Sequence, residues 1–264
     1  MQKKIIYDFG ANSGQNLKYF LSKSDLVIAV EPIFELCEKI KKNFNKEIKK
    51  GKLIVENLAV VDDDSISSVD FYQNNKSWLS TLKKDDSLDF KKIKVDSTTP
   101  TALFDKYGYP YYIKIDIENF DINILRFLKE KNIEPKFISF EAQNEETYNY
   151  FRNNFSYQFF NFVLGSRVHK DYGSRFEFHS SGPIFGDFKY NWVNERFLTL
   201  CLKIHKYGWI DIHCTNERVQ HVNCLEKIKI LLYFASDRFN KIILRNTNKL
   251  KGKFKEMLFK RRFN

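Results

Sequence analysis

The sequence predicts an α/β fold built around a doubly wound, mostly parallel sheet. Short apolar runs alternate with amphipathic stretches through roughly the first 160 residues, which is typical of βαβ units. Hydrophobic residues make up 43% of the 264 residues and aromatic residues 16%, which is ample for a large core. At this length we expect one α/β core with an extension.

The strand candidates each end in, or are soon followed by, a polar or acidic residue. In chain order they are KIIYDF, LVIAVE, KLIVENLAV, YYIKID, KFISFEA and YQFFNFV. The helix candidates between them carry apolar residues at spacings of three and four, as amphipathic helices do. They include GQNLKYFLSK, IFELCEKIKKNFNKEIKK and DINILRFLKEKN.

Two segments depart from this alternation. An insertion over about 62–105 holds SVDFY, KSWLSTL and KKIKVDS, for which we expect short antiparallel strands and a loop before a helix starting near Thr99. After Phe162 the rhythm is lost, and SRFEFHSSGPIFGDF predicts a loop over the sheet. A helix from about Asn194 to Lys206 and a strand in GWIDIH follow.

Two glycines stand directly after the first strand candidate, in YDFGANSGQN. In a parallel sheet, ligands bind outside the carboxyl ends of the strands. We therefore expect Gly10 to leave room for a ligand and Gly14 to allow a tight turn into the next helix. Asp8 and Asn12 supply polar groups beside them.

Glu31 ends the second strand candidate, 21 residues after Gly10. A carboxylate at this position can accept hydrogen bonds from both hydroxyls of an adenosine ribose. The glycine spacing is GxxxG, without the third glycine of a dinucleotide site or the lysine of a P-loop. Together these features predict a nucleoside site rather than a pyrophosphate site.

Five motifs stand at or just after the ends of the strand candidates, in the order YDFGANSGQN, VIAVEP, ENLAV, YIKIDIENFD and ISFEAQ. Their order and spacing match those of a known family. From about Ile5 to Phe162 the chain resembles the FkbM family of S-adenosylmethionine-dependent methyltransferases, which act mostly on hydroxyls of sugar-like and polyketide substrates. The resemblance implies a class I methyltransferase (Rossmann-like) fold, and from the sequence after Phe162 we expect a C-terminal cap and a basic helical tail in addition. One departure is Asn119, where the family commonly has glycine.

The resemblance also implies roles for residues in the cofactor site. Asp8, Gly10, Asn12 and Gly14 would cradle the methionine part of S-adenosylmethionine, and Glu31 would hold its ribose. Asn57, in ENLAV, would lie near the adenine.

Charged residues end the fourth and fifth strand candidates: Lys114, Asp116 and Glu118 in YIKIDIEN, and Glu141 in ISFEA. If the strand order of the family holds, Asp116 and Glu141 face one crevice beside the methyl donor. A carboxylate there can take the proton of an acceptor hydroxyl, or a divalent ion can activate it.

The catalytic candidates are therefore Lys114, Asp116, Glu141 and His179, the last in the Gly/Pro loop. Asp116 and Glu141 with His213 would make a mixed oxygen and nitrogen site of the kind that Mg, Mn or Fe accepts. Alternatively, Asp116 anchors the cofactor amine or the acceptor and Glu141 caps a loop. His213, Cys214, His221 and Cys224 lie close in sequence, but their spacing matches no zinc-finger pattern.

The formal net charge of +11 is concentrated in the last forty residues, where 12 Lys and Arg stand against 3 Asp and Glu. The first 224 residues carry only +2, which argues against nucleic acid as the substrate. The tail mixes apolar and basic residues at helical spacing, so we expect one or two amphipathic helices that bind an anionic membrane, dock on a partner or pack on the domain. Cysteine usage and the absence of a signal pattern predict a cytoplasmic protein, peripheral at the inner face of the membrane if the tail binds it.

We expect a methyltransferase domain over 1–224, with a cap over roughly 163–224 and the basic tail over 225–264. The activity expected from the resemblance is O-methylation of a carbohydrate or sugar nucleotide in bacterial surface-glycan (capsule or lipopolysaccharide) biosynthesis, assisted by a divalent metal if one is bound. Two alternatives stay open: an NAD-dependent oxidoreductase, and a non-catalytic adaptor that binds a polyanion or membrane through the tail.

Overall fold

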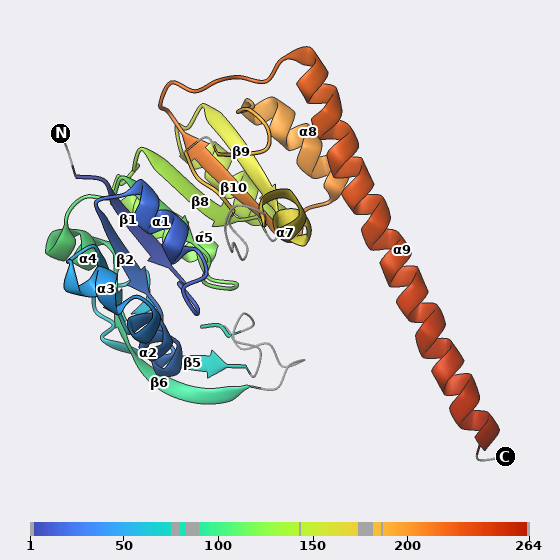
Figure 1. Cartoon of the computed structure of the whole chain (residues 1–264), viewed down its shortest axis with the longest axis horizontal. Coiled ribbons are helices and arrows are strands. Elements are labelled where there is room, and N and C mark those ends of the chain that lie inside the picture. Colours follow the sequence, from blue (N-terminus) through green and yellow to red (C-terminus); the bar gives the residue numbers. More distant parts are fainter. Residues whose placement is uncertain are drawn as a thin grey trace.

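The computed structural model describes residues 3–74, 80–82, 90–142, 144–173, 182–185 and 187–262, with side chains up to 243. Seven strands form the central sheet, in the order β3-β2-β1-β7-β8-β10-β9. Their bounds are β3 (Leu53–Glu56), β2 (Leu26–Val30), β1 (Ile5–Phe9), β7 (Tyr112–Ile115), β8 (Phe137–Glu141), β10 (Ile210–Thr215) and β9 (Phe159–Leu164). Neighbouring strands are parallel except that β10 runs antiparallel to both β8 and β9. The predicted doubly wound α/β fold is confirmed (Figure 1).

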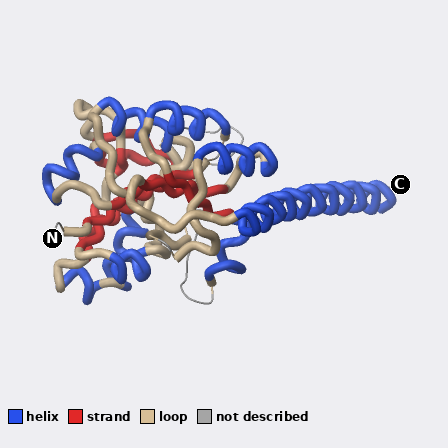
Figure 2. The backbone as a smooth tube through the Cα atoms, turned by 90° about the horizontal axis from the view of Figure 1, so that it is seen from above, coloured by secondary structure: helices blue, strands red, loops and turns tan. Residues whose placement is uncertain are grey.

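Helices cover both faces of this sheet (Figure 2). On one face lie α4 (Pro100–Tyr107), α5 (Asp121–Glu130), α6 (Glu145–Asn154), α8 (Glu195–His205) and the start of α9 (Cys224–Arg262). On the other lie α1 (Leu17–Lys23), α2 (Phe34–Asn43) and α7 (Val168–Tyr172), the last preceded by a short 3-10 turn, η2 (Gly165–Arg167). The strands that both layers enclose are accordingly apolar on both faces: every residue of β1 and β2 is buried.

A second, smaller sheet lies beside the first, in the order β4-β6-β5. It consists of β4 (Ala59–Val60), β5 (Ser68–Gln73) and β6 (Lys91–Thr98). The antiparallel pairing of β5 with β6 confirms the expectation for the insertion, and α4 begins at Pro100 with Thr99 as its N-cap. KSWLSTL lies mostly outside the described residues.

Some elements differ from their sequence patterns. KLIVENLAV is divided between the two sheets because the chain leaves the main sheet after Glu56. The second helix candidate is broken at Phe44 into α2 and α3 (Asn45–Lys49). The tail, in contrast, is a single helix, α9, and no described helix is long and apolar enough to span a bilayer.

Candidate functional site

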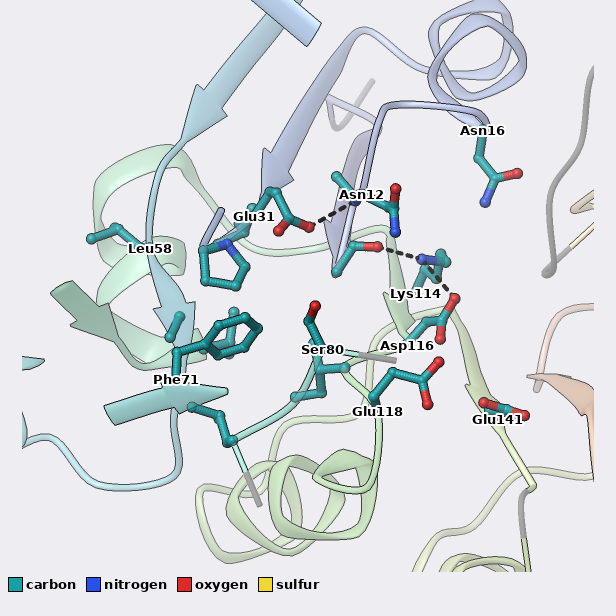
Figure 3. Close-up of a pocket in the computed structure, with 18 of the residues that line it drawn as sticks. Asn12, Asn16, Glu31, Leu58, Phe71, Ser80, Lys114, Asp116, Glu118 and Glu141 are labelled. Atoms are coloured by element: carbon teal, nitrogen blue, oxygen red, sulfur yellow. Dashed lines mark hydrogen bonds and ion pairs between the residues drawn. The ribbon is translucent and has the colours of Figure 1, made fainter. Parts of the chain in front are cut away.

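A cavity of about 420 Å³ opens at the carboxyl ends of β1, β2, β7 and β8 (Figure 3). One side is formed by the glycine loop and Glu31, and the other by Asp116, Glu118 and Glu141. Its lining residues are Gly10, Ala11, Asn12, Gln15, Asn16, Val30, Glu31, Pro32, Leu58, Ala59, Val60, Phe71, Ser80, Leu82, Lys114, Asp116, Ile117, Glu118, Glu141 and Trp209.

Gly10 lines the cavity as predicted, but the structure gives a different reason for the glycine. Its φ is +78°, and a Cβ there would lie 1.9 Å from the carbonyl oxygen of Asp116. We expected a side chain at this position to obstruct a ligand; it would first collide with the backbone that follows β7. The glycine therefore lets β1 and β7 approach closely where both strands end.

Gly14 also has a positive φ, +80°, which confirms the predicted tight turn before α1. A Cβ there would approach the side chains of Leu17 and Ile40, so the glycine packs against α1 and α2 and does not line the cavity. Asn12 lies between the two glycines at φ +49°, a left-handed conformation that asparagine tolerates, and it does line the cavity.

Glu31 is held in a fixed position by two backbone amides. Asn12 N–H donates to its Oε2 at 2.8 Å, and Ile33 N–H donates to its Oε1 at 3.0 Å. Burial raises the pKa of Glu31 to about 7, although these two amides and the charge of Lys114 act to lower it. The carboxyl group thus faces the cavity with lone pairs left for a diol.

Asn57 lies behind the cavity wall, next to Leu58, which lines the cavity. Its amide donates to the carbonyl oxygens of Glu31 and Pro32, at 3.0 and 2.9 Å, and the residue is not part of the cavity wall. The apolar wall next to Glu31 is instead made by Leu58, Val60 and Phe71. Sequence reasoning missed Phe71 because it comes from the insertion, whose small sheet folds back over the cavity.

Lys114 is almost completely buried and joins the two sides of the site. Its Nζ lies 3.0 Å from Asp8 Oδ1 and 3.3 Å from Asp116 Oδ2, and it donates to the Gly10 carbonyl at 3.1 Å. Burial alone would lower the pKa of Lys114, but the charges of Asp8 and Asp116 raise it above its ordinary value. The amine therefore stays protonated, so Lys114 as a catalytic candidate offers a positive charge and not a base.

The ion pair with Lys114 explains how the Asp8 carboxylate can be buried. Its carboxylate lies below the glycine loop, 1% exposed, and is not part of the cavity wall. Asp8 is connected to the cavity wall through Lys114, whose Nζ lies 3.0 Å from Asp8 Oδ1 and which ties the glycine loop to β7.

Asp116, Glu118 and Glu141 form a compact acidic group, here called the acidic triad. One carboxylate oxygen from each lies within 4.8 Å of the others, and all three line the cavity. Glu118 and Asn119 both have positive φ, 42° and 64°, so the turn after β7 is left-handed where the family commonly has glycine. The sequence did not single out Glu118 for the site, because nothing local shows that this turn aims it at Asp116.

Two further carboxyl groups lie close behind the triad. Asp211, in β10, is directly opposite Glu141 in the sheet and is 1% exposed, and neither of its oxygens has a hydrogen-bond partner among the described residues. Burial, followed by the charge of Asp116, raises the pKa of Asp211 well above its ordinary value. The same two causes raise the pKa of Asp121, at the start of α5, to about 7.

His213 is not part of this acidic group. It is opposite Ser139, two residue pairs deeper in the sheet than Glu141, and its ring centroid lies 4.8 Å from that of Phe188. Among the described residues, Glu118 takes the place that we expected His213 to fill. His179 lies outside the described residues.

Comparison with known proteins places this geometry in a family. The family model described as Methyltransferase FkbM domain matches residues 8–176. No curated protein matches the chain.

Several solved methyltransferase structures are distantly similar. The methyltransferase FkbM from Methylobacillus flagellatus KT is 14% identical, over 53% of this chain and 33% of that one, with a TM-score of 0.36; this chain thus spans about a third of that protein. The C-terminal domain of precorrin-6Y C5,15-methyltransferase from Rhodobacter capsulatus is 11% identical over 83% and 82% of the two chains, with a TM-score of 0.39. An rRNA methylase from Streptococcus thermophilus is 5% identical over 82% and 88%, also with a TM-score of 0.39.

TM-scores this low add nothing to the strand order described above. The family model, in contrast, covers well over half of the chain and includes the glycine loop, Glu31 and the acidic triad. The chain therefore belongs to the FkbM domain family of S-adenosylmethionine-dependent methyltransferases.

Proposed function

We propose that this chain transfers the methyl group of S-adenosylmethionine to a hydroxyl of a carbohydrate or sugar nucleotide. The observation that carries the proposal is one continuous cavity with a diol-binding carboxyl, Glu31, on one side and the acidic triad on the other. The first fits the ribose of the cofactor, and the second fits a nucleophile that must lose a proton.

The cofactor fits the β1–β2 side of the cavity by its chemistry. Glu31 offers oxygens to the two ribose hydroxyls, and Leu58, Val60 and Phe71 offer apolar surface for a purine. The backbone from Gly10 to Asn12 borders the same space and suits the polar methionine part. The methyl group of the sulfonium would then point toward β7 and β8.

The acceptor oxygen attacks the methyl carbon in line with the carbon–sulfur bond. That bond breaks, its electron pair stays on sulfur to give the thioether, and the hydroxyl proton passes to a carboxylate of the acidic triad. Because Lys114 remains charged, we assign the role of proton acceptor to the acidic triad among the described residues of the cavity wall.

A divalent cation bound by the acidic triad is part of the proposal. Three oxygens within 4.8 Å of one another match the hard oxygen ligands that Mg²⁺ and Mn²⁺ take. Asp211 adds independent support, since its buried carboxyl has no hydrogen-bond partner among the described residues and pairs with Glu141 across the sheet. Such an ion would lower the pKa of the acceptor hydroxyl and orient it.

The carbohydrate acceptor is supported by the family and by one aromatic residue. Of three aromatic residues of the cap that could stack on a sugar, Trp192 and Tyr172 are buried in the core, whereas Trp209 is 42% exposed and lines the cavity. Gly165 leaves room for its indole ring, since a Cβ there would lie 2.2 Å from a ring atom. A role in bacterial capsule or lipopolysaccharide synthesis is proposed from the resemblance.

The first test is calorimetric titration of the protein with S-adenosylhomocysteine, before and after chelation, followed by a methyl-transfer assay on sugar nucleotides. Binding and transfer to a hydroxyl support the proposal. No binding by the folded protein would overturn the cofactor assignment, and transfer to nitrogen or carbon would overturn the acceptor chemistry.

The metal is tested separately by Mn²⁺ binding to chelator-treated protein, followed by electron paramagnetic resonance. Glu118→Gln removes one ligand charge, and we expect Mn²⁺ affinity to fall about tenfold or more. The control is Glu38→Gln, an exposed change on α2 that should leave Mn²⁺ binding unaltered. Equal Mn²⁺ affinity of Glu118→Gln and wild type would remove the metal from the proposal.

A further inference from the structure

Helix α9 packs on the domain through one narrow face. Ile230, Phe234 and Asp237 are buried, and their spacing of four and three places them on one side of the helix. Asp237 accepts hydrogen bonds from Ser166 Oγ and His205 Nε2, both at 2.8 Å. Phe234 packs on Phe162 of β9, with ring centroids 4.6 Å apart. The orientation of the helix about its own axis is therefore fixed.

The opposite face of the same helix carries a second apolar surface, here called the outer stripe. At about 100° per residue, its members fall within an arc of roughly 100° whose centre lies about 160° from that of the buried face. They are exposed by 46% to 65%: Leu225, Ile228, Leu232, Phe239, Ile242 and Ile243. These are more than half of the large exposed hydrophobic side chains among the described residues, so the outer stripe is no ordinary solvated face.

Beyond the outer stripe the helix leaves the domain. Figures 1 and 2 show α9 extending past the body of the protein toward the C-terminus. In sequence, residues 244–264 contain eight Lys and Arg and one Glu. An apolar surface is thus continued by a strongly basic segment on one straight helix.

Either a second copy of the helix or a lipid bilayer could cover the outer stripe, and the charge of the tail favours one of them. Leu225, Ile228, Leu232, Phe239 and Ile242 stand at heptad spacing, which would also suit a second copy of the helix. The charged residues that would flank such a seam are Lys229, Arg238 and Arg245, with no acidic residue to pair with them. A second tail with a net charge of +9 would repel the first, whereas an anionic bilayer would attract both.

We propose that α9 lies along an anionic membrane surface, with the outer stripe inserted at the boundary between headgroups and acyl chains. The buried face meanwhile keeps the domain attached on the side away from the lipid. This surface is independent of the methyltransferase site: none of the outer stripe lines the cavity.

The test is flotation of the full chain with lipid vesicles. Vesicles of phosphatidylcholine alone are compared with vesicles in which about a third of the lipid is phosphatidylglycerol, at low salt and at about 0.5 M NaCl. We expect binding to the anionic vesicles, weakened by salt. The double variant Leu232→Ser/Phe239→Ser should bind them at least about tenfold more weakly, because two large apolar side chains are lost from the inserted surface.

The matched control removes two exposed apolar side chains elsewhere, in Tyr109→Ser/Leu200→Ser, and should bind like wild type. Circular dichroism and S-adenosylhomocysteine binding show that each variant is folded. Equal flotation of wild type and Leu232→Ser/Phe239→Ser would overturn the proposal, as would no flotation of wild type. A wild-type dimer in analytical ultracentrifugation that this double variant dissociates would overturn it as well, in favour of a second copy.

Discussion

If Glu31 holds the cofactor ribose as we propose, its raised pKa predicts that cofactor binding depends on pH near neutrality. Burial raises its pKa to about 7, so the group is protonated below that pH and ionised above it. Only the ionised carboxylate has both oxygens free to accept from the two ribose hydroxyls.

We therefore expect affinity for S-adenosylhomocysteine to rise about tenfold between roughly pH 5.5 and 8. Calorimetry across this range measures it, and Glu31→Gln should bind weakly at every pH. An affinity of the wild type that does not change with pH would contradict this account of Glu31.

The same raised pKa has the opposite sign for the stability of the unliganded protein. The folded state holds the Glu31 proton more tightly than the unfolded chain, so this contribution is fully present below the ordinary pKa of a glutamate. It is lost as the pH rises through about 7. Ionisation of the buried Glu31 carboxyl therefore lowers the stability of the unliganded protein near neutral pH. Hydrogen bonds from the cofactor hydroxyls to this carboxylate would offset that loss.

Individual site residues were predictable where they end a strand. Gly10, Glu31, Asp116 and Glu141 each follow an apolar run, and all four line the cavity. Lys114 and Asp8 sit within strands, so their pairing across β1 and β7 could not be seen locally. Asp211 was missed for the same reason: it meets Glu141 only because β10 returns antiparallel beside β8.

At the scale of elements, the contact between the end of β1 and the end of β7 is the tightest feature of the site. A side chain at Gly10 would collide with the Asp116 carbonyl, which cannot move without shifting β7. We expect Gly10→Ala to lower the free energy of unfolding by about 2–4 kcal/mol, as measured by urea denaturation.

Gly51→Ala is the matched control for this substitution. Gly51 also has a positive φ, +66°, but nothing lies within 4 Å of the added Cβ. Its cost should be the backbone strain alone, about 1 kcal/mol. Equal losses in the two variants would mean that the close approach of Asp116 contributes nothing.

The helices and strands were predicted well where the period of the apolar residues and the length of the segment indicated the same type of element. Six strands of the main sheet, all but β3, and α8 follow their patterns closely, because buried strands and amphipathic helices have distinct periods. The break at Phe44 and the division of KLIVENLAV could not be predicted, since each depends on tertiary packing and on which sheet accepts the strand.

At the scale of the whole molecule, the part of α9 that packs on the domain and the part that carries most of its positive charge are different segments of the helix. The described buried contacts of the helix come from Ile230, Phe234 and Asp237, whereas residues 249–264 hold seven Lys and Arg and one Glu. Removing 249–264 should leave the melting temperature and S-adenosylhomocysteine affinity unchanged.

The same truncation should weaken binding to anionic vesicles by roughly tenfold or more at low salt, since most of the positive charge is lost. Vesicle flotation of the two chain lengths makes the comparison. Equal partitioning would show that the basic end takes no part. The sequence predicted a basic amphipathic tail, but only the fold shows which of its two apolar faces the domain covers.

The excess of carboxyl groups over cations in the cavity wall also has a consequence for product release in the proposed reaction. Glu31, Asp116, Glu118 and Glu141 line the cavity, and Lys114 is the one cation among the described residues of its wall. Transfer of the methyl group converts a positively charged sulfonium into a neutral thioether. In the proposed reaction, the spent cofactor would therefore lose an electrostatic attraction that the methyl donor has. Discharge of the sulfur would then favour departure of the product and entry of fresh methyl donor.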